Sequence, residues 1–121
     1  MPTDAMPEDL GERTFRFAVR VRTFVRKLPR TLCNIEDVRQ LVRASGSVAA
    51  NYIEADESLS DKDFVLRIQI CRKESKESRL FLRLLDVQGN EALAAKREEL
   101  AQEARELMLI FKAIVREKGG R

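Results

Sequence analysis

The sequence predicts an all-α fold, namely an antiparallel up-down-up-down four-helix bundle. Apolar residues recur at three- and four-residue steps in four successive segments, which is the spacing that one face of a helix requires. Short polar connections join these segments, and such connections place consecutive helices side by side in opposite directions. The chain has 121 residues, 44% hydrophobic and 36% charged, which suits one helical domain with charged outer faces.

The expected boundaries follow from composition and from the proline and glycine positions. Residues 1–10 should form a flexible N-terminal tail, because this stretch is polar and contains Pro2 and Pro7. Residues 11–118 should form the bundle, and residues 119–121 should fray at the C-terminus. The expected helices cover residues 10–28, 35–58, 61–86 and 91–118.

The first helix should begin after Asp9, a good N-cap residue, and end before Pro29. Its core face has helical spacing and collects Phe17, Ala18, Val21, Phe24, Val25 and Leu28. A second, smaller apolar strip consists of Phe15 and Val19 and lies among arginines. Such a strip is consistent with a subunit contact and equally with ordinary surface exposure.

Capping residues mark the next two helices. Asn34 is the expected N-cap of the second helix, and Ser60 with Asp63 has the spacing of a capping box at the start of the third. Gly89 and Asn90 should stop the third helix. This helix carries two apolar faces, which implies partners on two sides. Leu66, Ile70, Phe81 and Leu84 form the second of these faces.

The fourth helix has the regular seam of a bundle helix. Its apolar residues alternate between four- and three-residue steps, and they are Leu100, Ala104, Leu107, Phe111 and Ile114. Four helices of this length complete the bundle.

Two polar clusters interrupt the apolar pattern of the middle helices. Ser47, Asn51 and Glu54 share one face of the second helix, and Lys73, Glu74 and Glu77 lie within the second apolar sector of the third. Charged groups can lie in an apolar contact only when they are paired and hydrogen-bonded. We therefore expect these six residues to form a structural network or an interface.

Basic residues are concentrated in the first helix. The segment from residue 13 to residue 30 carries seven cations and no acidic residue, although the whole chain has a net charge of only +3. Such a block is either a solvated helix face or a footprint for a phosphate-rich partner. Arginine favours phosphate recognition, so we expect nucleic-acid binding by Arg13, Arg16, Arg20, Arg22, Arg26, Lys27 and Arg30. Within this set, one phosphate row consists of Arg16, Arg20 and Lys27.

The composition argues against most enzyme and metal chemistry. The chain has no histidine and only two cysteines, so the usual zinc ligand sets are missing, and no cofactor is expected. No glycine-rich phosphate loop or nucleophile elbow is present. We interpret Cys71 as a core residue and assign no role to Cys33. Without a signal peptide or a membrane-length apolar run, we expect a cytoplasmic location.

Residues 40–85 carry a specific family pattern. The run SGSVAANYIEA, then S-x-x-D-F, then I-x-I-C-x-KES-x-E-S-x-x-x-L-x-LL, resembles the four-helix-bundle proteins encoded in intervening sequences of bacterial large-subunit ribosomal RNA genes. Phe81 keeps an aromatic residue of the family pattern, whereas Ala55 stands where the family often has glycine. The outer helices match the family in length and pattern only.

This resemblance implies a cytosolic bundle that assembles as a ring, commonly a homopentamer, without established enzymatic activity. The accessory proteins of diversity-generating retroelements resemble it in fold, and they use a basic ring surface to bind nucleic acid and a reverse transcriptase. Our main hypothesis is a non-enzymatic homo-oligomer that binds RNA or another polyanion. The alternative is a scaffold that docks an acidic protein or pairs with its own subunits, and a remote alternative is a carboxylate metalloprotein built on Glu54, Glu74 and Glu77.

Overall fold

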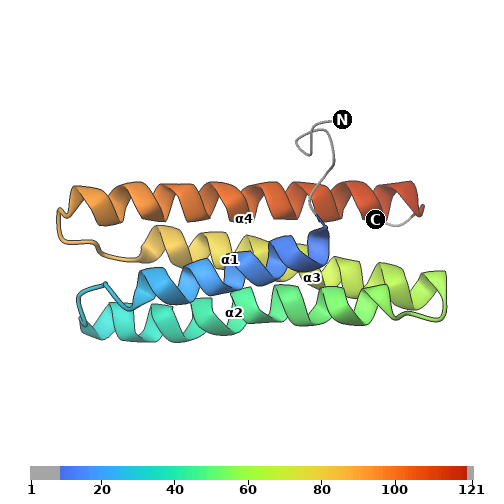
Figure 1. Cartoon of the computed structure of the whole chain (residues 1–121), viewed down its shortest axis with the longest axis horizontal. Helices are drawn as coiled ribbons and strands as arrows, with labels where there is room; N and C mark the ends of the chain where they lie inside the picture. Colours follow the sequence, from blue (N-terminus) through green and yellow to red (C-terminus); the bar gives the residue numbers. More distant parts are fainter. Residues whose placement is uncertain (1–8, 120–121) are drawn as a thin grey trace.

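The computed structural model describes residues 9–119 and contains four helices (Figure 1). These are α1 (Leu10–Val25), α2 (Leu32–Asp56), α3 (Asp61–Leu84) and α4 (Glu91–Glu117). Each helix packs against two others, in the cyclic order α1, α2, α3, α4, and no strand occurs within residues 9–119. The prediction of an all-α four-helix fold is confirmed.

The contacts between α1 and α4 follow opposite residue orders along the two helices. Arg13 contacts Glu106, whereas Arg20, further along α1, contacts the earlier residue Glu99. Figure 1 shows the same opposite order, because the colour gradient runs in opposite directions along α1 and α4. The basic residues of α1 therefore lie beside an acidic stretch of α4 that is distant in the sequence.

The interior of the bundle is apolar and is contributed by all four helices. Its largest fully buried side chains include Phe17, Leu41, Ile68 and Phe111. Cys71 is also fully buried, and its Sγ lies 3.5 Å from the carbonyl oxygen of Val48 as a weak donor. Burial raises the pKa of the Cys71 thiol to about 12. The prediction that Cys71 is a core residue is confirmed.

Two of the predicted helix caps are correct and one is wrong. The side chains of Asp9 and Ser60 accept hydrogen bonds from the first-turn amides of α1 and α3. The N-cap of α2 is Thr31, not Asn34. Asn34 is buried and joins two connections instead, since its Nδ2 donates to the carbonyl oxygens of Pro29 and Asp86, and its Oδ1 accepts from the amide of Asp86.

All four helices end earlier than the sequence predicted, by one to three residues, and the reason is visible at α1 and α3. α1 ends at Val25. The following amides of Lys27 and Leu28 donate to the carbonyl oxygens three residues earlier, as in a tighter 3₁₀ turn. α3 ends at Leu84, because Leu85 is extended with ψ 139° and its carbonyl oxygen accepts from Arg97 Nη1 at 2.6 Å. Asn90 belongs to α4 as its N-cap rather than to the end of α3.

The expected terminal segments fall largely outside the described range. The tail was placed at residues 1–10, but Leu10 is already the first residue of α1. Residues 1–8 and 120–121 lie outside the residues that the structure describes. None of the helices within residues 9–119 is both long and apolar enough to cross a membrane.

Candidate nucleic-acid interface

Arg13, the first of the predicted nucleic-acid-binding residues, is neutralised by α4. Its Nε and Nη2 each donate to Glu103 at 2.8 Å, and Nη2 also donates to Glu106 at 3.0 Å. The hydrogen bonds that Arg13 donates to Glu103 raise the pKa of Arg13 above its ordinary value. Because this two-point contact is partly buried, Arg13 acts mainly as a link between α1 and α4.

The next turn of α1 continues this paired seam. Arg20 Nη2 lies 3.6 Å from Glu99 Oε1, which also accepts from Lys96 Nζ at 3.2 Å. Arg16 is exposed and borders a crevice of about 210 Å³ between α1 and α4, together with Arg13, Phe17, Arg20 and Glu103. These ion pairs are exposed and therefore weak, so a phosphate group could compete with Glu99 for Arg20.

Arg22 is directed into the crossing of α1 and α2. Its Nη1 donates to the carbonyl oxygen of Ala18 at 3.0 Å, and its Nη2 donates to that of Val42 at 3.3 Å. A Cβ atom at Gly46 would lie 3.1 Å from Arg22 Nη2, which explains why a glycine suits this helix interior. Arg22 therefore has a structural role and is a poor phosphate ligand.

Three cations at the C-terminal end of α1 are exposed and unpaired. Arg26, Lys27 and Arg30 make no ion pair or side-chain hydrogen bond with any residue between 9 and 119. Their position also suits the negative end of the α1 dipole. We refer to these three residues as the α1-end cluster.

A groove lies between α1 and α4 next to the α1-end cluster. Its volume is about 310 Å³. An apolar floor and a basic rim are both present, since it is lined by Val19, Arg20, Thr23, Phe24, Lys27, Ala92, Leu93 and Lys96. The arrangement suits a ligand with negative charge and an apolar part.

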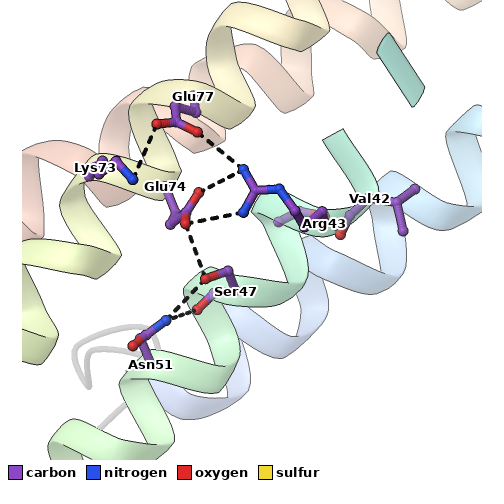
Figure 2. A network of polar contacts seen from close by, with 8 residues as sticks. Val42, Arg43, Ser47, Asn51, Lys73, Glu74 and Glu77 are labelled. Carbon is purple, nitrogen blue, oxygen red and sulfur yellow. Dashed lines mark hydrogen bonds and ion pairs between the residues drawn. The ribbon is translucent and has the colours of Figure 1, made fainter. Parts of the chain in front are cut away.

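The second predicted site is a polar network between α2 and α3 (Figure 2). Glu74 lies at its centre and is only 5% exposed. Arg43 Nη1 lies 3.3 Å from Glu74 Oε2, and Ser47 Oγ donates to the same oxygen at 3.3 Å. Glu74 raises the pKa of Arg43 through this hydrogen bond. A buried carboxylate needs such partners, so Arg43 compensates the charge that α3 places here.

Glu77 extends this network toward solvent. Arg43 Nη2 also reaches Glu77 Oε1 at 3.2 Å, and Lys73 Nζ lies 3.6 Å from Glu77 Oε2. Figure 2 shows Arg43 between the two glutamates of α3. One arginine from α2 therefore holds two successive turns of α3.

The network also runs along α2. Asn51 Nδ2 donates to Ser47 Oγ at 3.0 Å, and Asn51 Oδ1 accepts from Arg67 Nη1 at 3.1 Å. Five of the six residues predicted to share a network are thus joined by contacts, whereas Glu54 is exposed and lies outside the network. The sequence reasoning missed Arg43 and Arg67, although the need for a cation beside Glu74 could have indicated them.

Within residues 9–119, no group of three or more aspartate, glutamate or cysteine side chains is arranged to hold a metal ion. The remote alternative required Glu54 beside Glu74 and Glu77, and Glu54 does not lie among their partners. The two glutamates on α3 bind Arg43 instead.

The family model of 23S rRNA-intervening sequence proteins matches residues 9–113. The chain belongs to this family. The match covers α1, α2 and α3 in full and α4 up to residue 113, so it extends beyond the residues 40–85 that carried the resemblance. The resemblance read from the sequence is therefore confirmed.

A solved structure has the same fold as this member of the 23S rRNA-intervening sequence protein family. It is the crystal structure of a protein with unknown function from the S23 ribosomal protein family of Bacteroides thetaiotaomicron. The two chains share 22% sequence identity with a TM-score of 0.73, over 88% of this chain and 98% of the other. No curated protein matches the chain significantly.

Proposed function

We propose that the chain is a cytoplasmic, non-enzymatic subunit of a homo-oligomer that binds RNA or another polyanion. The subunit in this proposal is an antiparallel up-down-up-down bundle, and the oligomer is a ring. The α1-end cluster is the observation that carries the binding proposal, because its three cations have no acidic partner within residues 9–119. Arg16 and Arg20 extend the same row along α1, whereas Arg13 and Arg22 serve structural contacts.

Binding at this end of α1 would be directed mainly at phosphates. Arg26, Lys27 and Arg30 project from an exposed helix end, where side chains can follow a backbone but cannot read base edges in a fixed geometry. The affinity should therefore depend strongly on salt and weakly on sequence. Because the family is named for the intervening sequences of 23S rRNA, RNA is the first polyanion to test.

Fluorescence anisotropy with labelled RNA at low salt tests this proposal. The double variant K27Q/R30Q should bind RNA several-fold more weakly than the parent chain. R39Q/K62Q is the matched control, since Arg39 and Lys62 are also exposed and unpaired and the control removes the same charge. Equal affinity of all three proteins would refute binding at the α1 end. In a co-purification from native lysate, a partner protein that stays bound after nuclease treatment would instead favour the scaffold alternative.

An outer strip of α3 supports the oligomer part of the proposal. Leu66, Leu80 and Leu84 are each about half exposed, and they share this strip with Lys73 and Glu77 of the α2–α3 network. Exposed leucines around a partly satisfied ionic network are typical of a subunit contact. The position matches the second apolar face of the third helix in the sequence.

Light scattering at micromolar concentration tests the oligomer. The parent chain should be larger than a monomer, and L84E should shift it toward the monomer because a carboxylate in an apolar contact is costly. L32E is the control, since Leu32 is 87% exposed and belongs to α2. A monomeric parent chain would contradict the proposal.

A further inference from the structure

We infer that the chain has a second polyanion-binding surface, on the side where α3 and α4 meet, and that this surface fits the backbone of double-stranded RNA. We call it the α3–α4 basic face. It consists of Arg72, Lys76, Arg79, Arg83, Arg105, Lys112 and Arg116. The inference is independent of the α1-end cluster, although both would contribute to the function proposed above.

The four cations on α3 form one strip that borders α4. Arg72, Lys76, Arg79 and Arg83 follow one another at steps of four, three and four residues, which keeps them on one helix flank. The same strip continues backward through Gln69 and Val65, which line a crevice with Lys118 and Gly119 of the α4 end.

Lys118 fixes the position of α4 beside this flank. Its Nζ lies 3.6 Å from Asp61 Oδ1 and 5.5 Å from the ring centre of Phe64, both on the first turn of α3. The residues that Lys118 contacts or approaches thus lie on the flank of α3 that leads to Arg72. The basic strip of α3 is therefore adjacent to α4 rather than to α2.

The three cations on α4 lie on the flank away from α1. Arg105, Lys112 and Arg116 are spaced by seven and four residues, so they also share a strip. At about 100° per residue, this strip lies roughly opposite Glu103, which binds Arg13 of α1. Because α4 packs only against α1 and α3 among the described helices, the strip faces outward on the α3 side.

Unlike most of α1, this face has no internal neutralisation. None of its seven side chains makes an ion pair or a hydrogen bond with any residue from 9 to 119. On the α4 strip, Glu98 is a carboxylate at one edge, two turns before Arg105. A solvated helix face usually alternates opposite charges at three- and four-residue spacings. Here like charges follow one another at those spacings, from Arg72 to Arg83 on α3 and from Lys112 to Arg116 on α4.

The shape of the face indicates the kind of polyanion. The strip from Arg72 to Arg83 extends about 16 Å along α3 at 1.5 Å per residue, and packed helices lie about 8–10 Å apart. Two rows of cations on a rigid support fit two phosphate backbones of a duplex. None of the seven residues of the face is aromatic, so an unpaired base has none of them to stack on, which disfavours a single strand.

The salt dependence of duplex binding provides the test. A labelled RNA duplex of about 16 base pairs, the span of a small double-stranded RNA-binding domain, is titrated at several salt concentrations. K76Q/R83Q should weaken binding and reduce the slope of log K against log salt by about two, one for each lost phosphate contact. R39Q/K62Q removes the same charge elsewhere and should leave the slope unchanged. All four side chains are exposed, and circular dichroism verifies equal helix content.

The outcomes separate this inference from the proposed function. If K76Q/R83Q binds the duplex with the affinity and slope of the parent chain, the α3–α4 basic face is not a binding surface. If K27Q/R30Q binds the duplex as tightly as the parent chain while K76Q/R83Q binds it more weakly, the α1-end cluster is not a binding surface and this inference stands. Tighter binding of a single strand with the same number of phosphates would overturn the duplex assignment.

Discussion

Two regions of this chain carry seven cations each, and they differ in what surrounds those cations. In the arginine-rich segment of residues 13–30, Arg13 and Arg20 contact carboxylates of α4, and Arg22 contacts backbone carbonyl oxygens. On the α3–α4 basic face, no member has a partner within residues 9–119. The region whose cations are more densely spaced in the sequence is thus the one with fewer unpaired cations.

The difference arises because sequence density and spatial pairing are separate properties. Residues 13–30 contain no acidic residue, but Glu103 is 90 positions from Arg13 in the chain and contacts it directly. Packing of α1 against α4 brings these opposite charges together. The cations of the α3–α4 basic face are interrupted by apolar residues in the sequence and gather only on the folded surface.

The largest effect that would sharpen this comparison concerns stability. R13L removes a paired cation and leaves Glu103, whose side chain is only 15% exposed, without its main partner. We expect the free energy of unfolding to fall by about 1–3 kcal/mol, the cost of a poorly solvated group that loses its hydrogen bonds. R79L removes a half-buried but unpaired arginine and should change the free energy of unfolding by less than about 0.5 kcal/mol.

Urea denaturation measures the free energy of unfolding of R13L and R79L, since urea does not add ions that screen charges. Equal losses for R13L and R79L would mean that the contact between Arg13 and Glu103 adds nothing beyond ordinary side-chain packing. The distinction between a paired region and an unpaired region would then not hold energetically.

A smaller effect concerns ligand affinity on the paired side. Glu99 accepts from Lys96 and contacts Arg20, so it competes with any phosphate that approaches these cations. E99Q removes that competition and should raise the affinity for polyphosphate by roughly two- to five-fold, the equivalent of one weak surface ion pair. Isothermal titration at low salt measures the change. E54Q provides the control, since Glu54 is exposed on α2 and belongs to neither basic surface, and the same gain in both variants would indicate only the change in net charge.

Much of the fold was predictable because it depends on local and periodic features. Helical spacing of apolar residues identified four helices, and the caps at Asp9 and Ser60 marked two of their starts. Asn34 was misread because a capping residue and a buried linker look the same in sequence. Its partners at Pro29 and Asp86 come from two connections that meet only in the folded bundle.

The candidate sites were less predictable because they depend on pairing across helices. The spacing of Ser47 and Asn51 and the apolar context of Glu74 indicated a network, but their cationic partners Arg43 and Arg67 could not be assigned without the register between α2 and α3. The pairing of Arg13 with Glu103 was not predicted for the same reason. Periodicity gives the face of a residue on its own helix, but it does not give the residue opposite.

The smallest expected effect compares two exposed lysines on α3. Lys76 lies between Arg72 and Arg79 at helical spacing, so K76Q should relieve repulsion and raise the free energy of unfolding by a few tenths of a kcal/mol. Lys73 contacts Glu77, so K73Q should lower the free energy of unfolding by a similar amount. Urea denaturation at low salt resolves the signs, and about 1 M salt should remove both effects, because the screening length falls to about 3 Å. A loss of stability in both variants would show that Lys76 has a carboxylate partner, and the α3–α4 basic face would then be neutralised in the same way as Arg13 and Arg20 on α1.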